Sequence, residues 1–178
     1  MRTRLLIPTG LLVAALLVPA GDAHAHPRPD AKGVGLGVAV GFDYQRGVGI
    51  DGSVDVGTNQ SFAWGFFVDI PLLETFYITP AAMLYEIDLG DGKQAVTDVD
   101  INFKFIVPLG RARVGAGFIA GLTTGLGDYL GHYGGLGFFS FKLVSNLDAF
   151  AMVQFKRLAH GSVNYDNIHG YLGAMFIF

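Results

Sequence analysis

The sequence predicts an all-β fold, an eight-stranded antiparallel up-and-down transmembrane β-barrel, and three observations lead to it. Hydrophobic residues make up 51% of the chain and its mean hydropathy is +0.44. After the first 25 residues, however, no run approaches the roughly 20 apolar residues of a membrane helix. Apolar side chains instead alternate with small or polar ones in eight segments, the period of strands with two different faces.

The first four strands show this alternation in different ways. Residues 33–44 carry only apolar side chains on one face and only glycine, alanine and aspartate on the other. Residues 60–70 place large apolar side chains on one face, and residues 75–87 are largely apolar on both. Residues 97–107 alternate most clearly, with apolar residues facing out and Asp98, Asp100, Asn102 and Lys104 facing in.

The remaining strands are expected at residues 113–122, 134–143, 147–157 and 168–178. Strands of about 10 residues suit a tilted membrane crossing. Short turns at residues 71–74, 108–111 and 144–147 recur at a regular interval and predict one hairpin each. Longer connectors are expected at the opposite, outer end, at residues 45–59, 88–96, 123–133 and 158–167.

The start of the chain has the features of a secretory signal peptide. Arg2 and Arg4 precede an apolar run, and residues 23–25 form a small-x-small cleavage site. We therefore expect three parts: a signal peptide at 1–25, a short periplasmic tail at 26–32 and the barrel at 33–178. The absence of cysteine excludes a lipoprotein anchor, disulfides and thiolate metal sites.

The last eight residues resemble the C-terminal signal of bacterial outer-membrane β-barrels, with Tyr171, Gly173, Phe176 and Phe178 in the matching positions. With the strand count and length, the chain resembles the small eight-stranded outer-membrane family, the OmpA transmembrane domain and OmpX type. The resemblance implies an integral outer-membrane protein with both termini in the periplasm. It also implies contact with outer-membrane lipid and lipopolysaccharide, and with the barrel-assembly machinery during biogenesis.

The interior of the barrel, the lumen, is expected to hold a network of charges. An eight-stranded barrel is filled by its own side chains or holds one small ligand. We expect a salt-bridged plug, because opposite charges in a confined space neutralise one another. A gated path for small ions is the alternative. The network comprises Asp98, Asp100, Lys104, Arg113, Asp148 and Lys156, with Asp43 and Asp69 also facing inward.

The third strand leaves two arrangements open. If its tyrosines face lipid, then Ile78, Pro80 and Leu84 face inward and form an apolar, ligand-binding patch with Phe138 and Phe150. Pro80 also removes a backbone hydrogen bond in mid-strand, which could admit a lipid chain through the wall. Alternatively, a β-bulge at Pro80 reverses the register and returns Ile78 and Leu84 to the lipid face.

One cluster has the composition of a catalytic site. His160 and Ser162 resemble the His-x-Ser pair of outer-membrane lipid A deacylases, which works with a downstream glutamate. Here no glutamate follows, and Asp166 is the only carboxylate after the serine. The alternative is a polar surface loop, in which serine, asparagine, aspartate and glycine are common.

The net charge excludes one class of partner. It is −3 for the whole chain, and −4 once Arg2, Arg4 and Asp22 of the leader are removed, so no basic surface for nucleic acid is expected. The histidines do not have metal-site spacing, and we expect no cofactor. We therefore expect a non-enzymatic barrel with a structural or interaction role, possibly with an envelope protein partner. A lipid-handling barrel and a narrow ion pore are the alternatives.

Overall fold

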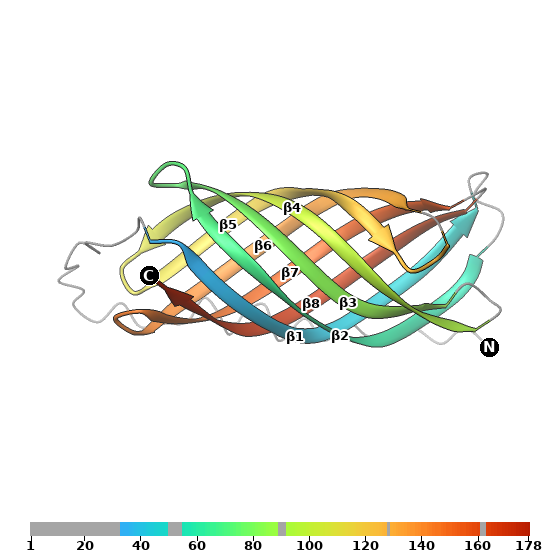
Figure 1. The fold of residues 1–178 in the computed structure, drawn as a ribbon, viewed down its shortest axis with the longest axis horizontal. Helices are drawn as coiled ribbons and strands as arrows, with labels where there is room; N and C mark the ends of the chain where they lie inside the picture. Colours follow the sequence, from blue (N-terminus) through green and yellow to red (C-terminus); the bar gives the residue numbers. More distant parts are fainter. Residues whose placement is uncertain (1–32, 50–54, 89–91, 128, 161–162) are drawn as a thin grey trace, which may run out of the picture.

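The computed structural model describes residues 33–49, 55–88, 92–127, 129–160 and 163–178. The expected leader and tail, residues 1–32, lie outside this description. The described residues form one closed antiparallel barrel in which each strand pairs with its neighbours in sequence (Figure 1). The strands are β1 (Gly35–Gly49), β2 (Asp55–Pro71), β3 (Phe76–Asp88), β4 (Lys93–Leu109), β5 (Ala112–Thr124), β6 (Leu130–Val144), β7 (Leu147–His160) and β8 (Val163–Ile177).

The last strand closes the barrel onto the first. β1 and β8 pair from Gly35 opposite Ile177 to Gly49 opposite Val163. The amide of Phe178 continues this seam by donating to the carbonyl of Val34 at 3.0 Å. The predicted eight-stranded closed fold is confirmed. In the described part of the chain, no helix is long and apolar enough to cross a membrane.

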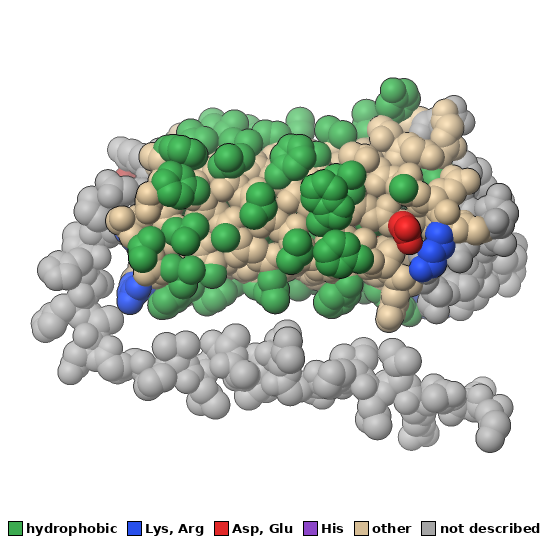
Figure 2. Space-filling view, turned by 60° about the horizontal axis from the view of Figure 1, so that its bottom comes forward, with side chains coloured by type: hydrophobic (Ala, Val, Ile, Leu, Met, Phe, Trp, Pro, Cys, Tyr) green, Lys and Arg blue, Asp and Glu red, His purple; other side chains and the backbone are tan. Residues whose placement is uncertain are grey.

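The barrel is apolar outside, and inside it buried polar and charged side chains lie among buried hydrophobic ones. Large apolar side chains cover the outer wall (Figure 2), and Val38 and Phe62 are 62% and 66% exposed. Inside, Asp98 and Lys156 are at most 1% exposed. A contiguous apolar surface of this extent is unfavourable in water and matches the lipid-facing band of a membrane barrel.

The short turns lie where they were predicted. Residues 72–75, 110–111 and 145–146 connect β2 to β3, β4 to β5 and β6 to β7 at the end of the barrel where Figure 1 marks the C-terminus. Gly110 has φ of +62°, the left-handed conformation that a tight turn requires and that glycine adopts without strain.

At the opposite end the predicted strand boundaries are wrong. β2, β4, β6 and β8 begin at residues 55, 93, 130 and 163, four or five residues before the predicted starts. Here the outward positions are polar, as at Arg46, Arg157 and Asp166, so the hydrophobic alternation stops before the backbone ladder does. Much of each expected outer connector is therefore strand.

The third strand places Ile78 and Leu84 on the outer face, as the second arrangement expected, but without the bulge. Tyr77, Thr79 and Met83 are at most 2% exposed and face the lumen, so Ile78, Pro80 and Leu84 lie on the outer face. The register between β3 and β4 runs without a shift, so there is no bulge at Pro80. The apolar inward patch predicted from these three residues is wrong, because the lumen instead accommodates the tyrosines of β3.

Candidate functional site

At the end with the short turns, the lumen contains two buried ion pairs. The Lys104 ammonium on β4 binds the Asp69 carboxylate on β2, and the Thr79 hydroxyl donates to the same carboxylate at 2.6 Å. The Arg113 guanidinium on β5 lies 2.8 Å from the Asp148 carboxylate on β7. Each pair joins strands that are not neighbours, so the pairs connect different parts of the barrel wall across the lumen.

Three phenylalanine rings lie next to this group. Phe67 and Phe150 meet edge to face at 5.1 Å, and Phe138 and Phe150 stack at 5.9 Å. The Lys104 ammonium lies 4.5 Å from the centre of the Phe138 ring and 5.2 Å from that of Phe67. Cation–π attraction strengthens when the cation is removed from water. Phe138 and Phe150 face inward as predicted, but they pack beside a cation.

A larger network, the outer cluster, fills the other half of the lumen. The Lys156 ammonium of β7 donates to Asp98 at 2.8 Å and to Asp100 at 2.6 Å. The Tyr85 hydroxyl of β3 lies 3.1 Å from both oxygens of Asp98. The cluster consists of Tyr85, Asp98, Asp100, Thr123, His132 and Lys156, from five consecutive strands. All six residues predicted for the charge network therefore lie in the lumen, in two groups.

His132 is a member that the sequence analysis missed. Its Nε2 lies 2.6 Å from Asp100, and its Nδ1 lies 2.9 Å from the Thr123 hydroxyl. The same hydroxyl donates to Asp98 at 2.6 Å. His132 therefore links the two carboxylates of the outer cluster, Asp100 directly and Asp98 through Thr123, beside the Lys156 ammonium that donates to both.

Three residues of the outer cluster, Asp98, Asp100 and His132, form the one group of possible metal ligands found in the described residues. Ligand atoms of Asp98, Asp100 and His132 lie within 4.8 Å of one another. The Lys156 ammonium already donates to both carboxylates, so a metal ion would have to displace a buried cation. The arrangement therefore fits an ion-pair network better than a metal centre.

A second histidine lies beside the outer cluster and faces an aspartate. His169 on β8 is directly opposite Asp43 on β1, and both are fully buried. The nearest ring nitrogen, Nδ1, is 3.5 Å from Asp43 and 3.0 Å from the Tyr171 hydroxyl. The Tyr85 ring meets the His169 ring edge to face at 4.9 Å.

Of the catalytic candidates, only one side chain is described. Asp166 lies at the outer end of β8 and binds Arg157 with two hydrogen bonds of 2.7 and 2.9 Å. Ser162 and the side chain of His160 lie outside the described residues. The predicted catalytic carboxylate is therefore held by a guanidinium on the neighbouring strand.

The residues of the C-terminal motif divide between the two faces of β8. Tyr171 points inward, whereas Phe176 and Phe178 lie on the outer face with their rings 4.8 Å apart. Gly173 is packed so closely that a Cβ would meet the carbonyl of Val38 and the ring of Phe150. The glycine thus allows β8 to approach β1 beside a large aromatic ring.

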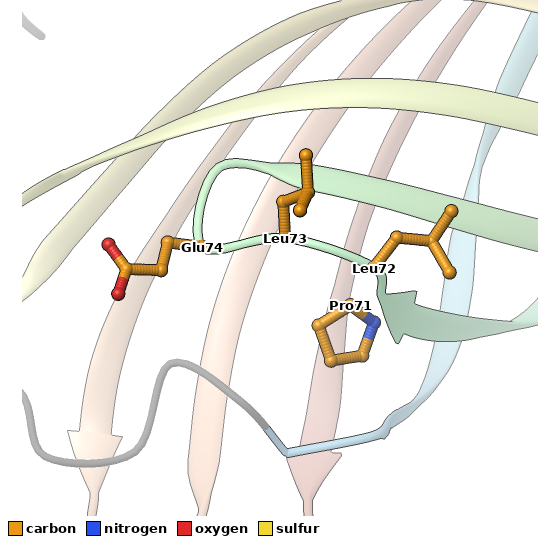
Figure 3. Close-up of a pocket in the computed structure, with 4 residues that line it drawn as sticks. All are labelled: Pro71, Leu72, Leu73 and Glu74. Atoms are coloured by element: carbon orange, nitrogen blue, oxygen red, sulfur yellow. The ribbon is translucent and has the colours of Figure 1, made fainter.

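A surface hollow of about 470 Å³ lies at the β2–β3 turn and is lined by Pro71, Leu72, Leu73 and Glu74. Figure 3 shows that these side chains spread from the turn in different directions. Because they do not converge on a common point, the hollow lacks the few oriented polar groups of a ligand site.

Solved structures similar to this one share its architecture. Neisserial surface protein A aligns with a TM-score of 0.62 and 12% identity, over 80% of this chain and 97% of that one. The outer membrane protein OprG of Pseudomonas aeruginosa aligns with a TM-score of 0.53 and 12% identity, over 83% and 97%. The chain has the fold of the small eight-stranded outer-membrane barrels. No protein-family model and no curated protein sequence matches it.

The likeness to these outer-membrane barrels is one of fold. At 12% identity it carries over no residue role. The function of this barrel therefore depends on the residues of its own lumen, wall and ends.

Proposed function

We propose that this protein is a small integral barrel of the bacterial outer membrane with a non-enzymatic, structural or interaction role in the envelope. It acts alone or as a subunit of a larger complex. The proposal is supported mainly by the filled lumen. Ion pairs and aromatic rings occupy its interior from the Asp69 pair to the outer cluster. The surfaces left for partners are the wall and the two ends.

The apolar wall supports the location. It would face membrane lipid and, in the outer leaflet, lipopolysaccharide. Residues 1–25 would direct export, and the barrel-assembly machinery would recognise the C-terminal motif. With residues 26–32 as a tail, both termini would lie in the periplasm, at the end of the short turns.

The alternative roles have less support from the geometry. A lipid-handling lumen was inferred mainly from Ile78, Pro80 and Leu84, which face outward. Hydrolysis would need Asp166, which Arg157 holds in a bidentate ion pair. A pore would require the pairs made by Lys104, Arg113 and Lys156 to open, which would leave buried charges without partners.

Native mass spectrometry of the protein, extracted gently from its own outer membrane, tests the role. We expect a barrel that retains a stoichiometric envelope protein, or a barrel that carries only exchangeable surface lipid. A fatty acid or lipid A fragment that stays bound in a one-to-one ratio after delipidation would contradict the proposal. Recovery of the protein from the soluble periplasm would contradict the location.

A further inference from the structure

Among the described residues, the buried acids of the lumen outnumber its permanent cations. In the described part of the chain, five aspartates are buried in the lumen: Asp43, Asp69, Asp98, Asp100 and Asp148. Three permanent cations, Lys104, Arg113 and Lys156, pair with four of these acids. His132 hydrogen-bonds to Asp100 and to Thr123. The fifth acid, Asp43, is the one that none of these three cations contacts.

Asp43 also lacks hydrogen bonds. Neither of its carboxylate oxygens has a hydrogen-bond partner among the described residues, although the side chain is fully buried. The Asn167 carbonyl oxygen and His169 Nε2 are likewise buried without a partner. A charged carboxylate in this situation is strongly disfavoured. An ionised Asp43 would therefore need a positive charge beside it.

The groups around Asp43 do not supply that charge. On β4, Asp98 adds repulsion, and on β7 the Lys156 ammonium is committed to Asp98 and Asp100. His132 on β6 is committed to Asp100. On β3 and β8, Tyr85 and Tyr171 present neutral hydroxyls. Opposite Asp43 on β2 is Ser61, which is uncharged. Among the described residues, His169 is the remaining base that lies beside Asp43.

We propose that Asp43 and His169 together form a binding site for a single proton, which balances the one lumen aspartate that Lys104, Arg113 and Lys156 do not contact. The pair is suited to this because imidazole and carboxylate are 3.5 Å apart and either can hold the proton. The proton either neutralises the Asp43 carboxylate or gives it an imidazolium partner. This site lies in the lumen, apart from the wall and ends to which the envelope role is assigned.

A proton fits this site better than a metal cation. Hard cations such as Ca²⁺ and Mg²⁺ take about six or more oxygen ligands. The site offers three unpartnered acceptor oxygens, two from Asp43 and one from Asn167. A proton needs only one acceptor, and the unmatched charge is a single unit.

The test is to locate the proton in the full-length mature barrel reconstituted in lipid vesicles at neutral pH. Infrared spectroscopy with ¹³C-labelled aspartate detects a neutral carboxylic acid, and ¹⁵N NMR of histidine detects imidazolium. We expect one proton, either as a single acid band lost in Asp43→Asn or as a His169 imidazolium signal that reverts to neutral imidazole in that variant. Asp148→Asn is the matched control, because it removes an aspartate paired with a permanent cation, and it should leave the signal in place.

The wild-type spectra decide the matter even if a variant fails to assemble. The proposal is overturned if all five lumen aspartates are ionised and His169 is neutral. Spectra in sodium, potassium and choline buffers would then show whether an alkali cation occupies the site. A signal that survives in Asp43→Asn and disappears in Asp148→Asn also overturns it. Where the acid band places the proton on Asp43, Asp43→Asn should unfold at an unchanged urea midpoint, because it replaces a neutral group.

Discussion

At the scale of single residues, the lumen depends on pairing. Lys156 lies at the centre of the outer cluster, where its ammonium donates to both Asp98 and Asp100 and is 1% exposed. Lys156 is the one permanent cation among the six residues of this cluster, so its two acids have no replacement for it. The stability of the barrel should therefore respond far more to the loss of a lumen charge than to the loss of a rim charge.

Replacing Lys156 with methionine keeps much of the side-chain volume and removes the charge. We expect a loss of about 3–5 kcal/mol in unfolding free energy, because two buried carboxylates lose their main partner. Urea unfolding in lipid vesicles measures it. The matched control is Arg157→Met at the next position, whose exposed pair with Asp166 should contribute at most about 1 kcal/mol. Equal effects of the two changes would contradict the lumen account.

Replacing Phe138 with leucine tests the aromatic contact to Lys104. The variant keeps an apolar side chain but removes the ring 4.5 Å from the ammonium. We expect a loss of about 1–2 kcal/mol, since this cation–π contact is desolvated. Phe139→Leu, one residue along and facing the exterior, is the control and should cost less. If the control proves the more costly substitution in the same urea titration, the ring does not stabilise Lys104.

At the scale of elements, the strands show which signals the sequence carries. Alternation located all eight strands, because it follows the boundary between lipid and lumen. It did not locate their outer ends, where outward positions become polar while buried side chains such as Ile87, Val96 and Leu158 are apolar, and so His132 was assigned to a connector. It also left the phase of β3 open, since apolar residues occupy both faces and only packing places the tyrosines inside.

The wall between β2 and β3 contains a local interruption. Phe67 pairs with Ala81 and Ile70 pairs with Ile78, but the two positions between them on each strand are not paired across this seam. The gap coincides with Pro80, which has no amide proton to donate. On the other side, Pro80 remains in register opposite Ile101. The interruption therefore belongs to the β2 side alone.

Pro80→Val should close this interruption. We expect slower amide exchange at Val68 and Asp69 and an unchanged rate on the β4 side at Asn102, because a donor returns to one seam only. Hydrogen exchange followed by NMR in lipid nanodiscs measures both. Protection gained at Asn102 instead would show that the missing donor had faced β4.

At the scale of the whole molecule, the barrel presents an apolar outer wall and encloses buried charged side chains in its lumen. Composition, alternation and the regular turns predicted this architecture from local signals alone. The pairings within the lumen could not be predicted, because Lys156 and Asp98 are 58 residues apart and meet only when the barrel closes. Their geometry is what favours a plugged barrel over a pore.

The central claim is that the lumen is a closed, charge-matched core. The most direct test is current recording across a planar lipid bilayer that contains the purified, refolded barrel. The account predicts no stable conductance steps, because opening would separate buried ion pairs at both ends of the lumen. Long-lived, ion-selective steps that scale with the number of inserted barrels would contradict it and make the lumen a pore.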